Sequence, residues 1–135
     1  MDKLTPERRS ANMSRIRSRD TSPEMIVRRL VHGMGYRYRL HVASLPGKPD
    51  IVLPRLKRII EVQGCFWHQH PGCIDSHVPK SRFQYWGPKL DRNQCRDREN
   101  RRILGRLGWR VCVVWECETK FTGKLARRLA HFLEK

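Results

Sequence analysis

The chain has 135 residues, with 29 Lys or Arg against 13 Asp or Glu, which gives a formal net charge of +16 at pH 7 and a pI of about 10.7. This length suits a single domain with one hydrophobic core, and so large a basic excess predicts a polyanionic partner. Because the sequence has neither an apolar run of about 18 residues nor a signal peptide, we expect no membrane partner and a cytoplasmic location.

The N-terminal stretch over 1–20 is basic and poor in large apolar side chains. Thr5-Pro6 is typical of a helix start, but the residues that follow lack the wide apolar stripe with which a helix packs on a core. We therefore predict a basic, DNA-binding arm or helix over 1–20 and a single folded domain over 21–135. Met13 would either dock on that domain or act as an apolar wedge in DNA.

A helix is predicted to begin near Ser22-Pro23, where Thr21 and Glu24 fit a capping box, and to end at Gly33 and Gly35. The charge of Glu24 in the first turn complements the helix dipole. Apolar residues at helical spacing form the core face of this helix: Ile26, Val27, Leu30, Val31 and Met34. Strands are expected over 36–40, 50–53 and 58–62, and a turn over 54–57 joins the last two.

A long polar helix is expected over 88–107, after a break at Gly87-Pro88. Its predicted apolar face consists of Leu90, Ile103, Leu104 and Leu107. The middle of this helix is rich in arginine, which indicates either a solvated face or a surface that lies along a duplex. A buried strand over 111–115 and an amphipathic helix over 122–133 complete the order α-β-β-β-α-β-α. That order predicts an α/β fold with a mixed sheet and helices on its faces.

The segment GCFWHQHPGC, over 64–73, combines the thiol and imidazole groups that zinc prefers. Together with the distant Cys117 it predicts a closed, structural site of three cysteines and one histidine: Cys65, His70, Cys73 and Cys117. His68 is an alternative to His70, since alternate residues can face the same way. The odd count of five cysteines favours metal binding over disulfides in a reducing compartment, and Cys112 is predicted to be a buried core residue.

A second, harder metal site is predicted where Pro49-Asp50 is followed after ten residues by Glu61-Val62-Gln63. This spacing resembles the P-D-(x)n-(D/E)-x-K motif of restriction-type nucleases. Asp50 and Glu61 would hold Mg²⁺ across a strand hairpin, together with the backbone carbonyl of Val62. Gln63 stands where lysine is common in that motif, and it can orient a water molecule but supplies no positive charge.

The same segment contains a candidate proton-transfer residue, His68. His41 and His77 are interpreted as ordinary surface residues. Three aromatic residues in polar surroundings, Phe66, Trp67 and Trp86, would either cover the zinc site or stack on bases. Three nearby basic side chains favour nucleic acid: Lys80, Arg82 and Lys89.

Several ordered motifs together resemble the very short patch repair (Vsr) endonucleases over nearly the whole chain. They are TPERRSANMSRIRSRDTSPE, SLPGKPDIV, GCFWH, VPKS, the region 93–97 and LGWRVCVVWECE. The resemblance implies a restriction-endonuclease-like (PD-(D/E)xK) α/β/α core with a structural zinc site. It also implies an enzyme that nicks one DNA strand on the 5′ side of the thymine in a T:G mismatch, which arises when 5-methylcytosine deaminates.

Carried over by motif, the resemblance makes Asp50 the main Mg²⁺ ligand, His68 the base and Glu24 a supporting residue of the active site. Cys65, His70, Cys73 and Cys117 fall on the zinc positions. The aromatic residues Phe66, Trp67 and Trp86 fall on a major-groove wedge, and Met13 falls on a minor-groove wedge. Further DNA contacts are expected from Asn12, Lys89, Asn93 and Arg96.

The sequence departs from the usual family pattern at Glu61-Val62-Gln63, because members usually carry an apolar residue at the first position and His or Asp at the third. Glu61 would then add a metal ligand, or Gln63 would weaken the site. Two alternatives follow: a non-catalytic zinc module that binds DNA, and a restriction-type enzyme that cuts both strands. The implied partner is double-stranded DNA with a T:G mismatch, bound by a monomer at the bacterial nucleoid, with mismatch-repair and polymerase proteins as further partners.

Overall fold

The computed structural model describes residues 20–78 and 80–134, so the predicted arm, with Asn12 and Met13, lies outside the described residues. Three helices and four strands make up the described fold: α2 (Ser22–Gly33), β1 (Arg39–Leu40), β2 (Ile51–Leu53), β3 (Arg58–Gln63), α3 (Phe83–Arg106), β4 (Arg110–Trp115) and α4 (Thr122–Glu134). Short 3₁₀ helices lie at Ile74–Ser76, Lys80–Arg82 and Glu116–Lys120. The predicted order of helices and strands is confirmed.

The four strands form one mixed sheet in the order β1-β2-β3-β4. The first two pairings are antiparallel, with Ile51 opposite Ile60 in the pair β2–β3. β3 and β4 run parallel, and their register places Gln63 opposite Trp115. The C-terminal ends of β3 and β4 therefore lie at the same end of the sheet. The predicted site residues gather at this end.

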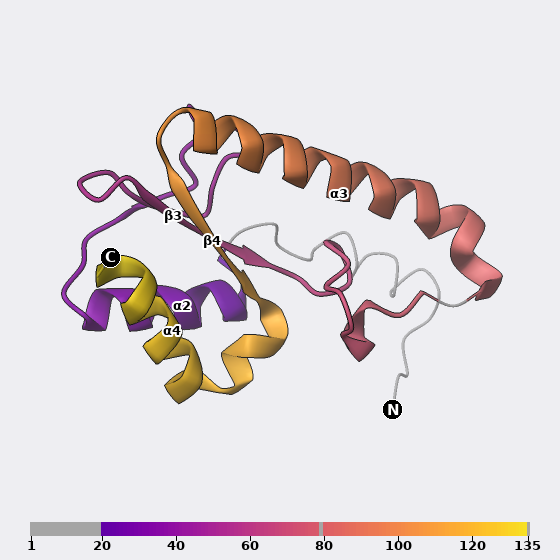
Figure 1. Ribbon diagram of the computed structural model, residues 1–135. Coiled ribbons are helices and arrows are strands. Elements are labelled where there is room, and N and C mark those ends of the chain that lie inside the picture. The colour runs from indigo at the N-terminus through magenta and orange to yellow at the C-terminus, as the bar shows by residue number, and fades with distance from the viewer. Residues whose placement is uncertain (1–19, 79, 135) are drawn as a thin grey trace.

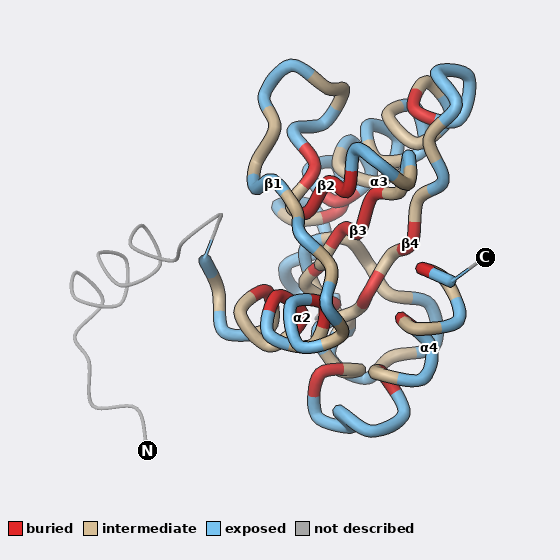
Figure 2. Tube along the Cα trace, turned by 90° about the vertical axis from the view of Figure 1, so that its left-hand side faces the viewer, coloured by how far each residue is buried: buried red, intermediate tan, exposed pale blue. Residues whose placement is uncertain are grey.

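Helices cover both faces of the sheet (Figure 1). Side chains alternate along the strands, so Ile51, Ile60 and Val114 belong to one core cluster with α2 and α4, whereas Val52 and Ile59 pack against Leu104 of α3 on the other side. Figure 2 shows the buried stretches of the strands between these helices. Cys112 is buried in the first cluster, which confirms its prediction as a core residue.

The helix α2 follows its sequence signals closely. Thr21 caps it, since its side chain accepts a hydrogen bond from the Glu24 backbone N–H, and the helix ends at Gly33. Its buried apolar residues are Val27 and Val31, with Leu30 and Met34 partly buried against the same cluster. Amphipathic spacing and a good N-cap are strong local signals, and here tertiary packing agrees with both.

The long helix α3 begins at Phe83, five positions before the expected start at Pro88, so the predicted break at Gly87-Pro88 is wrong. Pro88 is the sixth residue of this helix, so it removes the N–H that would bond to Gln84 and places its ring against the carbonyl of that residue. Gly87 is buried, and a Cβ there would lie only 3.2 Å from the Phe83 ring. The glycine therefore accommodates an aromatic side chain from the preceding turn.

Two smaller expectations also need correction. The strand predicted over 36–40 is ordered as β1 only at Arg39–Leu40, and Tyr36 and Tyr38 pack instead against the α2–α4 core. Leu107, expected on the apolar face of α3, is 51% exposed because it lies at the C-cap, and Trp109 packs against the smaller core instead.

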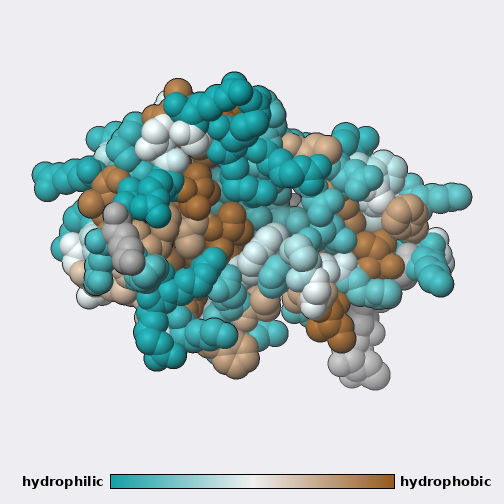
Figure 3. Space-filling model, viewed as in Figure 1, coloured by the Kyte–Doolittle hydropathy of each residue, from teal (hydrophilic) through white to brown (hydrophobic). Residues whose placement is uncertain are grey.

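The surface along α3 is strongly polar. Arginines on this helix point to solvent at positions Arg92, Arg96, Arg98 and Arg102. Figure 3, viewed as in Figure 1, shows hydrophilic side chains along the upper edge of the molecule, where α3 runs. Within the described part of the chain, no helix is both long and apolar enough to cross a bilayer.

Candidate functional site

A cleft of about 610 Å³ opens at the edge of the sheet where β3 ends. It collects predicted site residues from five parts of the chain: Glu24 of α2, Asp50 before β2, Val62 and Gln63 of β3, Phe66, Trp67 and His68 after β3, and Asn93 and Arg96 of α3. A smaller neighbouring cavity of about 140 Å³ is lined by Asp50, Glu61 and His68. The structure thus brings together residues that are up to 72 positions apart (24 to 96).

Asp50 is held by the neighbouring strand, because the Val62 backbone N–H donates a hydrogen bond of 2.8 Å to its Oδ2 atom. Burial, together with the negative charges of Glu24 and Glu61, raises the pKa of Asp50 to about 7, and the Val62 hydrogen bond opposes this rise. A carboxyl group crowded in this way by other acids is stabilised in its ionised form by a cation.

Glu24 is almost completely buried, with a side chain only 3% exposed. One of its oxygens, Oε2, accepts a hydrogen bond of 2.7 Å from Arg28 and a second from the backbone N–H of Asp20. The other oxygen, Oε1, is buried without a hydrogen-bond partner among the described residues. The carboxylate therefore does more than complement the helix dipole, since it brings a negative charge to the wall of the cleft.

His41 was expected on the surface, and that interpretation is wrong. Its side chain is 11% exposed and lies between Arg28, Glu24 and Asp50. The backbone of His41 adopts a positive φ of 48°, and its N–H donates to the Asp50 carbonyl. No periodic pattern in the sequence indicates this placement, because a loop residue carries no signal of burial.

Glu61 and Gln63 lie side by side on β3, and both are buried. The Gln63 side-chain nitrogen donates a 3.2 Å hydrogen bond to Glu61 Oε2, and Arg101 Nη1 lies 3.9 Å from the same oxygen. Burial raises the pKa of Glu61, and Arg101 counteracts it. Glu61 and Asp50 both line the smaller cavity. This geometry allows the two acids to bind one cation, which stays a prediction.

His68 faces α3 rather than the cysteines. Its Nδ1 atom lies 2.6 Å from Oδ2 of Asp97. One turn earlier on the same helix, Asn93 donates a 3.2 Å hydrogen bond to the Trp67 carbonyl. Sequence reasoning assigned no role to Asp97, because nothing local marks one acid among the many charges of α3. The pair fixes the ring of His68, and within residues 20–78 and 80–134 its Nε2 atom has no hydrogen-bond partner.

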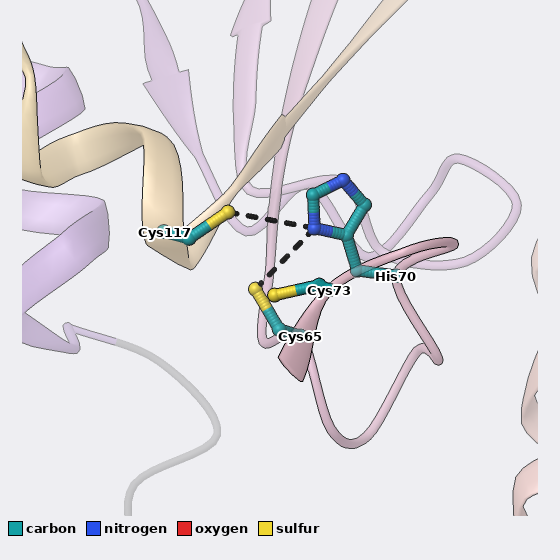
Figure 4. Close-up of side chains that lie close together, drawn as sticks. All are labelled: Cys65, His70, Cys73 and Cys117. Atoms are coloured by element: carbon teal, nitrogen blue, oxygen red, sulfur yellow. Dashed lines mark hydrogen bonds between the residues drawn. The ribbon is translucent and has the colours of Figure 1, made fainter. Parts of the chain in front are cut away.

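A compact cluster joins the loop after β3 to the segment after β4. The Sγ atoms of Cys65, Cys73 and Cys117 and a ring nitrogen of His70 all lie within 4.8 Å of one another (Figure 4). His70 Nδ1 is 3.4 Å from Cys117 Sγ and 3.7 Å from Cys65 Sγ. The structure therefore places His70, and not His68, among the cysteines. Three thiols and one imidazole at these separations could hold a tetrahedral, thiophilic ion such as zinc.

The thiols of this cluster influence one another's protonation. Burial, together with the neighbouring thiols of Cys117 and Cys73, raises the pKa of Cys65 to about 12, while a hydrogen bond with the Cys117 backbone lowers it. A bound divalent cation reverses that preference, because metal ligands must be thiolates. Trp115 stacks on the His70 ring with centroids 4.3 Å apart, so its ring covers one side of the cluster.

The aromatic residues predicted near the site pack on each other. Phe66, Trp67 and Trp86 form three edge-to-face pairs with ring centroids 5.2 to 5.4 Å apart. Trp67 is 38% exposed, and Lys89 lies 3.9 Å from the ring centroid of Tyr85, the neighbour of Trp86. This aromatic cluster is therefore a partly exposed, apolar feature beside a basic helix, and two of its rings, Phe66 and Trp67, line the cleft.

A cleft with buried acids and an Asp-oriented histidine, placed beside an arginine-rich helix, is typical of an enzyme that cuts nucleic acid, and the chain is a DNA endonuclease. The sequence model of the family described as DNA mismatch endonuclease Vsr matches residues 1–73, which include Glu24, Asp50 and His68. The chain belongs to this Vsr family.

Curated relatives agree with this assignment over most of their length. A type II nicking enzyme of Xanthomonas oryzae, V.XorIIP, is 49% identical, and the match covers 98% of this chain and 97% of the relative. The DNA mismatch endonuclease Vsr of Escherichia coli is 43% identical over 92% of this chain and 77% of the relative. The type II nicking enzyme V.NmeAIP of Neisseria meningitidis is 42% identical over 88% of this chain and 84% of the relative.

Proposed function

We propose that this endonuclease nicks one strand of duplex DNA on the 5′ side of the thymine in a T:G mismatch, by Mg²⁺-dependent hydrolysis. The observation that carries the proposal is the placement of Asp50 and the His68–Asp97 pair around one pair of adjoining cavities. The names of relatives add support, since one is a mismatch endonuclease and two are nicking enzymes. Acting on chromosomal DNA, it would work as a monomer at the bacterial nucleoid, beside mismatch-repair and polymerase proteins.

The acids of the cleft fit a hard cation. Asp50, Glu61 and the Val62 carbonyl would hold it, while Glu24 contributes a buried oxygen without a hydrogen-bond partner. When bound, Mg²⁺ neutralises charge on the scissile phosphate and makes a coordinated water more acidic. Gln63 lines the cleft and would orient that water. The raised pKa of Asp50 is consistent with this role, because crowded carboxylates favour a cation.

His68 is placed to accept the proton of the attacking water. Its Nδ1–H is directed to the carboxylate of Asp97, so the lone pair for proton transfer is on Nε2. A carboxylate partner keeps the ring in this tautomer and favours the imidazolium form once the proton has moved. The role of the dyad is therefore general base catalysis by His68, with Asp97 as its positioning residue.

Mismatch selectivity would come from the aromatic cluster. Inserting a ring between base pairs costs a few kcal/mol of stacking, and the cost is lowest at a mismatch. Phe66, Trp67 and Trp86 present the required rings, and Met13 of the arm would insert from the minor groove. Lys89, Asn93, Arg96 and Asn12 would contact the backbone around the opened step. The cysteine–histidine cluster would hold structural zinc.

A nicking assay tests the proposal. Wild-type protein with Mg²⁺ should nick the thymine strand of a T:G duplex and leave the T:A duplex of the same sequence intact, and Asp50→Ala should abolish the nick. Tight binding without any Mg²⁺-stimulated cleavage would instead identify a non-catalytic zinc module. Breaks in both strands of the T:A duplex would identify a restriction-type enzyme.

A further inference from the structure

Two polar side chains of β3, Glu61 and Gln63, point to the same face of the sheet. One residue separates them on the strand, and alternate residues of a strand share a face. Ile59, two residues before Glu61, packs on this face against Leu104 of α3. Both polar residues are buried. The row therefore runs beside α3 from the apolar core to the cleft, which Gln63 lines.

The side of α3 that meets this row changes from apolar to charged along the helix. Leu104, Arg101 and Asp97 follow one another at spacings of three and four residues, so they lie on one side of the helix. Leu104 is buried, and the other two are partly buried. Arg101 Nη1 lies 3.9 Å from Glu61 Oε2. Asp97 is paired with His68. One charge of α3 thus lies beside Glu61 and another beside the proposed base.

The Oε2 atom of Glu61 has two polar neighbours. The Gln63 side-chain nitrogen Nε2 donates a hydrogen bond of 3.2 Å to it. Arg101, at 3.9 Å, is too distant for a hydrogen bond but forms an ion pair. Burial raises the pKa of Glu61, and the positive charge of Arg101 is the main opposing influence. The guanidinium and the amide therefore stabilise a carboxylate that has lost most of its hydration.

This hydrogen bond determines the orientation of the Gln63 amide. An ionised carboxylate can only accept hydrogen bonds, so Nε2 of Gln63, and not Oε1, faces Glu61. Gln63 lines both the large cleft and the smaller cavity, and Glu61 lines the smaller cavity. The carbonyl oxygen Oε1 is consequently the end of the amide that can accept a hydrogen bond in the large cleft.

An acceptor at this place suits a water molecule better than a phosphate oxygen, because phosphate oxygens need donors. Gln63 and His68 line the same two cavities. A water between them would direct one proton to Nε2 of His68 and the other to Oε1 of Gln63, so that its lone pair faces the phosphorus. As the water oxygen bonds to phosphorus, His68 takes the first proton, and the bond to the leaving oxygen breaks with its electron pair. The second proton stays on the nucleophile, and solvent protonates the leaving oxygen.

We propose that Gln63 is the hydrogen-bond acceptor that orients the attacking water, and that Glu61 and Arg101 are positioning residues that hold its amide in this direction. The inference rests on the proposed function, because it requires hydrolysis in the cleft. It adds a second role to Glu61 besides that of a metal ligand. Loss of a ligand weakens metal affinity, whereas loss of water orientation lowers kcat at saturating Mg²⁺.

A double-mutant cycle tests whether Glu61 acts through Gln63. Gln63→Met removes the amide and Glu61→Leu removes the acceptor, each with a side chain of similar size. With T:G duplex and Mg²⁺ both saturating, each variant should lower kcat about 10-fold, and the double variant should also lose about 10-fold rather than about 100-fold. Glu61→Gln keeps a carbonyl acceptor, so its kcat should fall less than about 3-fold.

The orientation of the amide is observed directly in proton–nitrogen spectra of the glutamine side chains at alkaline pH, where Glu61 is ionised. One Nε2 proton of Gln63, assigned by its absence in Gln63→Met, should be shifted downfield and exchange slowly in the wild type. Glu61→Leu should abolish this shift and Arg101→Met should reduce it, whereas Arg101→Lys should retain it. Thermal melts of every variant report the fold separately.

Losses in kcat that multiply in the double variant would overturn the inference, since Glu61 would then act independently of Gln63. A wild-type kcat in Glu61→Leu, or a Gln63 amide resonance that this substitution leaves unchanged, would overturn it as well. If the wild type failed to nick T:G duplexes, the proposed function would fail, whereas the amide spectra would still decide whether Glu61 and Arg101 hold Gln63.

Discussion

Nδ1 of His68 lies 2.6 Å from Oδ2 of Asp97, although 29 positions separate the two residues. The contact joins the loop after β3 to the middle of α3. The long helix is therefore more than a basic surface for a phosphate backbone, because it also supplies the carboxylate that orients the proposed base.

Replacement of Asp97 by asparagine should uncouple this pair. Asparagine keeps the shape but removes the charge that stabilises the imidazolium form, so kcat for nicking is expected to fall about 100-fold. The affinity for the T:G duplex, measured by fluorescence anisotropy, should change little. Asp91→Asn, at an exposed position of the same helix, is the control. An equal loss in both variants would point to surface charge rather than to the dyad.

The nicking rate should depend on the ionisation of Asp50. The pKa of this buried carboxyl is raised to about 7, so without metal it is largely protonated below pH 6 and ionised above pH 8. Binding of Mg²⁺ requires the ionised form, and the apparent Mg²⁺ affinity should therefore rise with pH across this window. Rates measured against Mg²⁺ concentration at several pH values test this, and saturating metal should shift the acidic limb to lower pH.

The ionised carboxylate of Asp50 should lower the free energy of unfolding at alkaline pH. Its pKa is about 7 in the folded protein against 3.8 when unperturbed, so the folded state binds more protons between these values and stability falls as pH rises through them. Without divalent ions, Asp50→Asn should be more stable than wild type by roughly 2 kcal/mol at pH 8. At pH 4 the difference should nearly vanish. Asp75→Asn, at an exposed position, should show no such trend.

Loss of a cluster cysteine should affect folding more than chemistry. With Cys117→Ser, zinc content measured by mass spectrometry should drop well below one ion per chain. The melting temperature should fall by about 10 °C, because the ends of β3 and β4 would no longer be joined. Cys95→Ser provides the control, since Cys95 is exposed and lies outside the cluster. A melting temperature that is unchanged by Cys117→Ser would exclude a structural metal there.

The aromatic cluster should determine mismatch preference. Trp67→Ala removes the exposed ring and leaves the acids of the cleft in place. We expect the ratio of T:G to T:A nicking to fall about 10-fold or more, because stacking by one ring contributes roughly 1–3 kcal/mol. Phe121→Ala, which removes another exposed aromatic ring, should leave the ratio unchanged. A uniform loss on both duplexes would indicate that Trp67 supports the fold instead.

Elements with strong periodicity were predictable from the sequence. The bounds of α2 and α4, of the hairpin strands β2 and β3 and of β4 agree with their apolar patterns to within one or two residues. The prediction that β4 is a buried strand is wrong for most of its length, because only Cys112 and Val114 are buried. The start of α3 was not predictable, because Gly87-Pro88 ordinarily ends a helix and only the packing of Phe83 against Gly87 shows why it continues here. The extent of β1 depended on tertiary contacts in the same way.

The candidate site divides along similar lines. Ligand chemistry concentrated in one short segment made the cysteine–histidine cluster predictable, and a motif with fixed spacing marked Asp50. Arg28, His41 and Asp97 had no such signal, because each gains its position only from folding: one buried in a helix, one in a loop with positive φ, one on a distant helix. In a chain with this many charged residues, the sequence does not indicate which of them will have a charged or polar partner in the fold.

The cysteine that completes the cysteine–histidine cluster, Cys117, follows His70 by 47 positions. During translation, the ribosome releases Cys65, His70 and Cys73 long before Cys117 emerges, so the growing chain offers three of the four donors. Tetrahedral coordination must wait until β4 has been synthesised and has paired with β3. A product truncated before Cys117 would carry Asp50 and His68 without the full set of four donors, which would delay assembly of the DNA-cutting centre until Cys117 has been synthesised.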